Sequence, residues 1–268
     1  MRTVLAVMPA FMRVSLATMF QYRAEIVLWA VWGVVYPAVA LAMWGAAVAG
    51  TGGTDIKGFA PSDFAAYFLL TMVIGHLGTA WDVYEMGYMV RSGRMSTRLL
   101  RPLLPIWSSV ADNVAYKLLT LTILIPVWMI VVWVTRPTFN IGWAQLVYGL
   151  PAVLLASVLS YLWGYILALV AFWTTKTEGV GEVWFGMSLF FGGRLAPLTI
   201  MPPILQWIAA FLPAKWIVWF PAAALMGRLS IPEMTWGLLM QAFWLVGGLV
   251  VFRFTWRAAV KRYTAVGI

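Results

Sequence analysis

Long apolar runs are the feature that most constrains this chain. The first clear run, IVLWAVWGVVYPAVALAMWGAAV, covers residues 26–48. A helix needs about 20 such residues to cross the ~30 Å hydrocarbon layer of a membrane. The runs are continuous, whereas the strands of a membrane barrel alternate between apolar and polar residues. Because backbone groups in lipid must be hydrogen-bonded within their own segment, these runs predict membrane-spanning helices.

The balance of apolar and charged residues supports this prediction. Hydrophobic residues make up 63% of the 268 and charged residues only 10%, which leaves too little polar surface to cover a soluble globule. We therefore expect an all-α integral membrane protein with one transmembrane domain over residues 1–268. The six expected spans are 26–48, 64–83, 109–134, 144–173, one that begins near Val183, and 235–252.

Two further apolar segments do not fit a simple span. Residues 1–22 are interrupted by Pro9 and Arg13, which predicts an interfacial helix that lies along the membrane surface. Residues 192–232 are apolar for too long to form one span, and glycines and prolines break them repeatedly. Short re-entrant helices fit this pattern better than an apolar external loop, since irregular backbone is tolerated at membrane depth when protein buries it.

The cationic residues are unevenly distributed between the two sides that six spans define. Lys and Arg accumulate in cytoplasmic loops, so the formal net charge of +9 points to membrane orientation rather than to nucleic acid. The side that holds both termini is richer in Lys and Arg, and we expect it to be cytoplasmic. The residues on that side are Arg2, Arg13, Arg23, Arg91, Arg94, Arg98, Arg101, Lys117, Lys176, Arg253, Arg257, Lys261 and Arg262, against Lys57, Arg136, Arg194, Lys215 and Arg228 outside.

The sequence offers little catalytic chemistry. It has no cysteine and a single histidine, His76, which excludes thiolate metal sites and a three-histidine site. No phosphate-binding loop and no Gly-x-Ser-x-Gly elbow are present. We expect no catalytic residue, metal or cofactor in this chain, so that any energy source lies elsewhere.

Polar and small residues form stripes on two of the expected spans. A spacing of three or four residues places side chains on one face of a helix, and small residues on such a face allow close packing in lipid. Either a subunit interface or a conduit fits these stripes. His76 is either a functional ionisable group or a neutral side chain hydrogen-bonded to a neighbouring helix. The stripes are Thr71, Gly75, Gly78 and Asp82, with His76 and Thr79 beside them, and Glu182, Gly186, Leu189 and Gly193.

The segment MVRSGRMSTRLLRPLLP, residues 89–105, concentrates four arginines between the second and third spans. It predicts a short helix with an apolar face of Met95, Leu99 and Leu100 and a basic face. Two interpretations stand: the arginines contact anionic lipid, or the helix docks onto a cytoplasmic protein.

Three segments together resemble a known family. WDVYEMGYMVRSGRMSTRLLRPLLP resembles the segment that ends the second span in permeases of type-2 ABC exporters, closest to the viologen-exporter-like subfamily. FFGGRLAPLTIMPPILQWIAAFLPAKWIVWFPAAALMGRLS is similar to the family's external segment, and WRAAVKRYTAVGI to its cytoplasmic tail. The chain departs from the family pattern at Tyr88–Val90, which precedes Arg91 where family members place an Ile-Arg pair closer to the acidic residue.

The resemblance implies the permease subunit of an ATP-driven exporter in the bacterial inner membrane, with both termini cytoplasmic. Its partners would be two ABC ATPase subunits, which bind the ATP and magnesium, a second permease subunit, identical or related, and membrane lipids. Residues 86–107 would form the coupling segment, and residues 192–232 would act as an outer gate. The implied coupling residues are Arg91, Arg94, Met95, Arg98, Leu99 and Arg101.

The route or dimer interface implied by the resemblance combines the two stripes with nearby aromatic residues. Aromatic side chains suit amphipathic cargo, and they can also hold cationic cargo over their faces. The implied route residues are Thr71, Gly75, His76, Gly78, Thr79, Trp81, Asp82, Glu182, Gly186, Phe190 and Phe191, and the implied gate residues are Arg194, Pro197, Pro202 and Pro203.

Two other functions remain open on the sequence alone. A proton-coupled secondary transporter or channel would use the ionisable groups His76, Asp82 and Glu182 and would need no ATPase. A scaffold or lipid-interacting membrane protein would need neither.

Overall fold

The computed structural model describes residues 2–53, 55–174 and 177–264 and confirms the all-α prediction. Within these ranges helices carry the fold, and the one extended pairing is an isolated bridge between Ile56 and Phe59. Three parts of the sequence predictions lie outside the described residues: Met1, Lys176 and the last four residues of the tail.

The helices follow one another with short connections. In chain order they are α1 (Arg2–Gln21), α2 (Arg23–Gly50), α3 (Pro61–Gly78), α4 (Asp82–Arg91), α5 (Met95–Leu99), α6 (Ile106–Thr135), α7 (Trp143–Ala168), the 3₁₀ turn η1 (Leu169–Phe172), α8 (Glu178–Phe191), the 3₁₀ turn η2 (Leu198–Ile200), α9 (Pro203–Ala210), α10 (Pro213–Ile217), α11 (Trp219–Leu225) and α12 (Ile231–Arg262).

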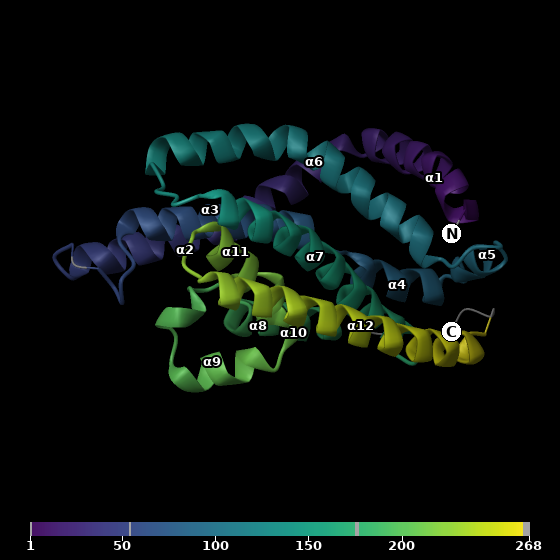
Figure 1. Ribbon diagram of the computed structural model, residues 1–268. Helices are drawn as coiled ribbons and strands as arrows, with labels where there is room; N and C mark the ends of the chain where they lie inside the picture. The colour runs from purple at the N-terminus through teal and green to yellow at the C-terminus, as the bar shows by residue number, and fades with distance from the viewer. Residues whose placement is uncertain (1, 54, 175–176, 265–268) are drawn as a thin grey trace.

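The long helices run roughly along one axis of the molecule (Figure 1). Both ends of the described chain and α5 lie at one end, here named the inner end, and the α2–α3 loop, the α6–α7 loop and α9 lie at the other, the outer end (Figure 1). The names follow the orientation predicted from the charges. Termini at a common end agree with an even number of crossings.

Within the described ranges, six helical stretches are long and apolar enough to cross a membrane, but they are not the six that the sequence predicted. Five match predicted spans; the sixth is α1, over Val4–Gln21. The predicted fifth span does not appear as one long helix. It corresponds to α8, whose 14 residues extend only ~21 Å. The chain turns at Gly193, where φ is +81° and a Cβ would lie 2.6 Å from the Tyr67 hydroxyl.

The contacts of α1 place it near the inner end. Ser15 donates a hydrogen bond to Asp112 in the second turn of α6 (2.6 Å), and Phe11 lies under the guanidinium of Arg101, just beyond α5. Only Tyr22 separates α1 from α2, and the two helices run in the same general direction (Figure 1). They therefore do not form an antiparallel pair of spans. This geometry suits the predicted interfacial helix, although α1 alone is long enough to cross.

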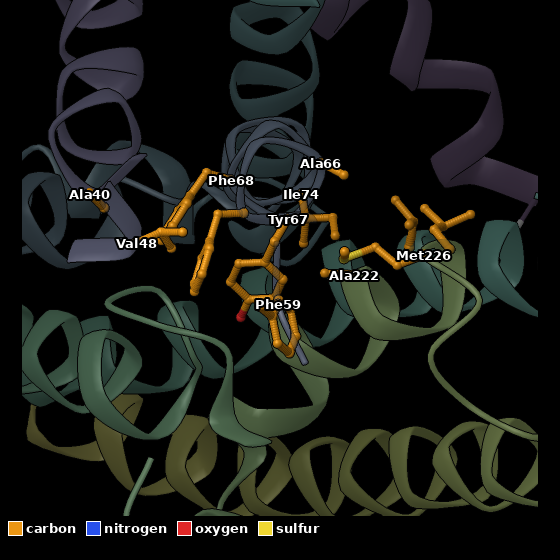
Figure 2. Packing of buried hydrophobic residues seen from close by; sticks show 12 residues of the cluster. Ala40, Val48, Phe59, Ala66, Tyr67, Phe68, Ile74, Ala222 and Met226 are labelled. Atoms are coloured by element: carbon orange, nitrogen blue, oxygen red, sulfur yellow. The ribbon is translucent and has the colours of Figure 1, made fainter. Parts of the chain in front are cut away.

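The core is centred on α3, which packs against α2, α6, α7 and α11. Figure 2 shows side chains from α2, α3 and α11 around Tyr67 and Phe68. Both rings are almost fully buried, and they meet edge to face at 5.5 Å, a geometry that aromatic quadrupoles favour. Among the stretches long enough to span a membrane, the one that contains α3, and with it the polar stripe, is thus the most buried.

The segment of residues 192–232 is folded onto the rest of the molecule. Between α9 and the α10–α11 pair the chain bends by 84°, as in a broken span or a re-entrant loop. Its backbone carbonyls accept hydrogen bonds from Tyr67 Oη (at Gly193, 2.6 Å), Trp44 Nε1 (at Leu195, 2.9 Å) and Lys57 Nζ (at Ile200, 3.1 Å). The alternative of a loose apolar loop does not fit these contacts, and re-entrant helices remain the prediction.

The buried hydrogen bond from Tyr67 gives a direct test of this attachment. We expect Tyr67→Phe to lower the free energy of unfolding by about 1–3 kcal/mol, because the Gly193 carbonyl loses its buried donor. Thermal unfolding of the purified chain in detergent, followed by tryptophan fluorescence, measures the change. Tyr88→Phe is the control, since Tyr88 is half exposed; equal effects of the two substitutions would contradict the attachment.

Candidate functional site

The helix α5 is tied to α6 through Arg98. Its Nη1 lies 3.2 Å from the hydroxyls of both Ser108 and Ser109, and its Nη2 lies 3.5 Å from Asp112 Oδ2. Asp112 also accepts the hydrogen bond from Ser15 of α1. Arg98 therefore joins α5 to α6, and through Asp112 to α1, at the inner end of the molecule.

The opposite side of α5 is held by the end of α12. The hydroxyl of Tyr263 donates to the Gly93 carbonyl (3.2 Å) and shares a 2.7 Å hydrogen bond with the Ser96 hydroxyl. Met95 is fully buried in a cluster formed with residues of α4, α7 and α12. Because of these contacts, a displacement of α5 would also displace α4, α6 and α12.

The predicted coupling residues divide into two groups by direction. Met95 and Arg98 face the protein, and Leu99 packs on the same cluster as Met95. Arg94 and Arg101 are exposed, their guanidiniums over the rings of Tyr88 (5.1 Å) and Phe11 (5.9 Å). Arg91 forms a long, largely exposed ion pair with Glu178 (3.8 Å), which contributes little stability.

Among the large apolar side chains of the described residues, the most exposed one lies at this end. Leu100, directly after α5, is 86% exposed and lies between the exposed arginines Arg94 and Arg101 in the sequence. An isolated exposed leucine is ordinary. An exposed leucine that lies near cations and directly follows a helix bonded on two sides is a suitable contact for a partner protein.

The stripe on α3 is covered by other parts of the chain. Ser160 of α7 packs against Gly78, and its hydroxyl donates to the Gly78 carbonyl (2.7 Å). Thr79 and Thr71 bond to backbone carbonyls of α3 itself, and the Thr79 carbonyl accepts from Asn113 of α6 (2.8 Å). Close helix packing accounts for this part of the stripe.

His76 and Asp82 have separate surroundings. His76 Nε2 lies 3.1 Å from the Thr120 hydroxyl of α6, between the rings of Tyr116 and Trp128, which is the arrangement expected for a histidine bonded to a neighbouring helix. Asp82 is buried, and the charged groups around it are Glu85, Arg98, Asp112 and Lys117. Asp82 thus belongs to a polar cluster that includes the α5–α6 connection.

The part of the second stripe around Glu182 and Gly186 is open in the single chain, whereas Gly193 is buried. A Cβ on Gly186 would touch nothing within 4 Å, and Phe185 and Phe190 are about half exposed. Glu182 is exposed and has a long hydrogen bond with Tyr84 (3.4 Å). This uncovered face fits a route or a subunit interface.

The remaining aromatic residues of the predicted route point elsewhere. Phe191 packs into the cluster around Ala196 in the outer segment. Trp81 packs on Trp29 of α2, with ring centroids 4.7 Å apart. These two side chains contribute to packing in the single chain.

The predicted gate meets the predicted route at one point. A Cβ on Gly75 would lie 3.2 Å from Nη1 of Arg194, so the guanidinium occupies the space left by this glycine. Pro197 is buried before η2, whereas Pro202 and Pro203 are exposed where α9 begins. The structure therefore brings Arg194 of the gate against α3 and leaves the last two prolines at the surface.

A family model described as ABC-2 family transporter protein matches residues 51–267. The chain belongs to this family. The comparison with curated proteins found no match, and neither did the comparison with solved structures.

Membership of the ABC-2 family makes the chain a multi-pass membrane protein and the permease component of an ABC transporter, which implies association with an ABC ATPase subunit. The match covers α3 to α12 and hence every predicted coupling, route and gate residue. The chain is therefore a membrane transport component, and among its described residues no cluster of His, Asp or Glu could hold a metal.

Sequence reasoning missed two partners of α5 in this ABC-2 permease. Asp112 was one of few acids at the start of an apolar span, which is an unusual place for a charge and was a usable signal. Tyr263 lay in a short polar tail and carried no pattern that pointed to α5.

Proposed function

We propose that the chain is the permease subunit of an ATP-driven exporter, moved by ATPase subunits that dock onto α5. The observation that carries the proposal is the two-sided construction of α5. Its outward side presents Leu100 with Arg94 and Arg101, while its inward side is fixed by Arg98 to α6 and by Tyr263 to α12.

The mechanism needs no chemistry in this chain. ATP and magnesium bind to the two partner ATPases, and nucleotide binding draws these subunits together. Because α5 is bonded to α6 and α12, its displacement tilts both long helices. ATP shifts such an equilibrium only through its different affinity for the two states of the complex, and the docked α5 transmits that difference.

The proposal includes a second permease subunit, identical or related. Few residues of the long helices α2, α6 and α12 are buried in the single chain, and the face of α8 around Gly186 is uncovered, so lipid and a partner subunit have surface to cover. It also includes the bacterial inner membrane, cytoplasmic termini and the likeness to the viologen-exporter-like subfamily. That likeness concerns architecture and says nothing of cargo.

No observation favours the proton-coupled alternative. His76 bonds to Thr120, Asp82 lies in the cluster near Arg98, and Glu182 is on the exposed face of α8. A proton relay requires neighbouring groups, and these three residues do not share one environment.

Docking at α5 is tested by replacing the exposed apolar side chain of Leu100 with a charged one. We expect Leu100→Glu to reduce the ATPase that co-purifies with the tagged permease by at least about tenfold, because the substitution buries a charge in the interface (~1.4 kcal/mol or more). Lys261→Glu, an exposed charge reversal on α12, is the control and should leave co-purification intact. If the Leu100→Glu permease retained as much ATPase as wild type, the ATPase would bind at a site other than α5.

A further inference from the structure

Arg194 is a cation at membrane depth for which the described part of the chain provides no anionic partner. Its guanidinium lies against Gly75, which is about 21 Å along the helix from the outer end of α3 and therefore near the middle of the Pro61–Arg91 span. The Nε atom is fully buried and has no hydrogen-bond partner. The ionisable groups that the structure places near it are the phenols of Tyr36 and Tyr67.

A second copy of the chain could not supply the missing negative charge. A symmetric pair of permeases related by an axis along the membrane normal keeps each residue at its own depth. The nine acids of the sequence lie toward the two ends of the spans, so none comes to the depth of Gly75. They are Asp55, Asp63 and Glu233 at the outer end and Glu25, Asp82, Glu85, Asp112, Glu178 and Glu182 toward the inner end.

The surroundings of Arg194 are largely aromatic and lie near an uncovered helix face. Tyr36 of α2 packs edge to face on Phe185 of α8, next to the uncovered face of α8 around Gly186. Arg194 itself is only partly buried, which leaves its terminal nitrogens within reach of a ligand. A desolvated guanidinium binds phosphate or carboxylate through paired hydrogen bonds.

Lys215 is a second cation for which no ion pair is found among the described residues, and it lies further out. Trp219 packs against Gly193, next to Arg194, and also lines an outer pocket of about 580 Å³. In that pocket Lys215 lies over the rings of Trp216 and Trp219 (4.9 and 5.1 Å). The carboxylate of Glu233, which also lines this pocket, already accepts hydrogen bonds from the backbone nitrogen and the hydroxyl of Ser230. The aromatic faces are therefore already occupied by a cation, which disfavours cationic cargo.

We propose that Arg194 binds the anionic group of an amphipathic cargo, a phosphate or carboxylate attached to an apolar body, on its way to the outer pocket. This inference rests on the proposed export function and names its substrate class. In this proposal Arg194 recognises the negative charge of the cargo, and the surrounding aromatic side chains contact the apolar body of the cargo.

The test uses the permease purified with its ATPase in phosphatidylcholine nanodiscs without nucleotide. The probes are dodecyl phosphate and dodecyltrimethylammonium, whose binding is measured by calorimetry after subtraction of partitioning into empty nanodiscs. We expect wild type to bind the phosphate at least about tenfold more tightly, and Arg194→Gln to lose that preference, since hydrogen bonds to charged groups carry such a difference. Arg136→Gln, an exposed cation at the outer end, should keep it.

The other outcomes are equally decisive. Unchanged preference in Arg194→Gln, or tighter binding of the ammonium probe by wild type, overturns the inference. If Arg194→Gln does not fold, Arg194→Lys should still prefer dodecyl phosphate but bind it more weakly, and loss of all preference there overturns it too. If phosphatidylglycerol in the nanodiscs abolishes dodecyl phosphate binding, the site belongs to a resident lipid rather than to cargo. Failure of the wild-type ATPase to co-purify would count against the export function alone.

Discussion

Arg98→Ala is expected to leave the ATPase bound while disconnecting α5 from α6. The substitution removes the contacts to Ser108, Ser109 and Asp112, but Leu100 and the exposed arginines that form the proposed docking surface stay in place. Each hydrogen bond that the guanidinium makes contributes about 1.5–3 kcal/mol when buried, and less at a partly exposed site such as this one. The loss is sufficient to loosen a five-residue helix.

The absence of cysteine from the sequence makes this measurable by spin labelling. One label replaces Thr97 on α5 and another replaces Val114 on α6, both exposed positions. In wild type the distance between the labels should keep one narrow distribution with and without ATP and magnesium. In Arg98→Ala we expect the distribution to widen severalfold when ATP is added, since α5 then moves without α6.

Arg94→Ala is the matched control, because Arg94 belongs to the same segment but contacts only the ring of Tyr88 among the described side chains. It should preserve the narrow distribution. If Arg98→Ala released the ATPase while Leu100→Glu retained it, the docking surface would lie on the side of α5 that the structure shows facing α6.

Five of the spans were predictable because each is a continuous apolar run. The expected spans 26–48, 109–134 and 144–173 correspond to α2, α6 and the α7–η1 stretch, with ends displaced by a few residues. Hydropathy determines which segments enter lipid. It does not determine where a short helix such as α8 ends, since this depends on the close approach of Tyr67 to Gly193.

The side chains of the candidate site were predictable only in part. The pattern of α5 identified its arginines and its apolar residues, but a helix of five residues does not show which side meets the protein. The inward direction of Arg98 is set by Ser108 and Asp112, which lie on the next span. The role of Gly75 was likewise hidden, because its partner Arg194 is more than a hundred residues away in the sequence.

The contact between Gly237 and Phe220 was likewise not predictable from the sequence. The ring of Phe220 on α11 occupies the place where a Cβ on Gly237 of α12 would be. Phe220 is almost fully buried beside Trp216, so the ring has little room to move. This contact limits how closely α11 and α12 can approach each other.

Gly237→Ala is therefore expected to destabilise the protein, although glycine to alanine inside a helix normally stabilises by up to about 1 kcal/mol. Forcing Phe220 out of place should cost about 3 kcal/mol or more, at the upper end of overpacking effects, and Gly237→Leu should prevent folding. Thermal unfolding in detergent measures both. Gly247→Ala is the control on the same helix, because a Cβ there meets nothing within 4 Å, and its effect on stability should have the opposite sign.

Phe220→Leu should partly restore the stability that Gly237→Ala loses, and a double-mutant cycle detects this coupling. If Gly237→Ala and Gly247→Ala changed the stability alike, α11 and α12 would not meet in this way.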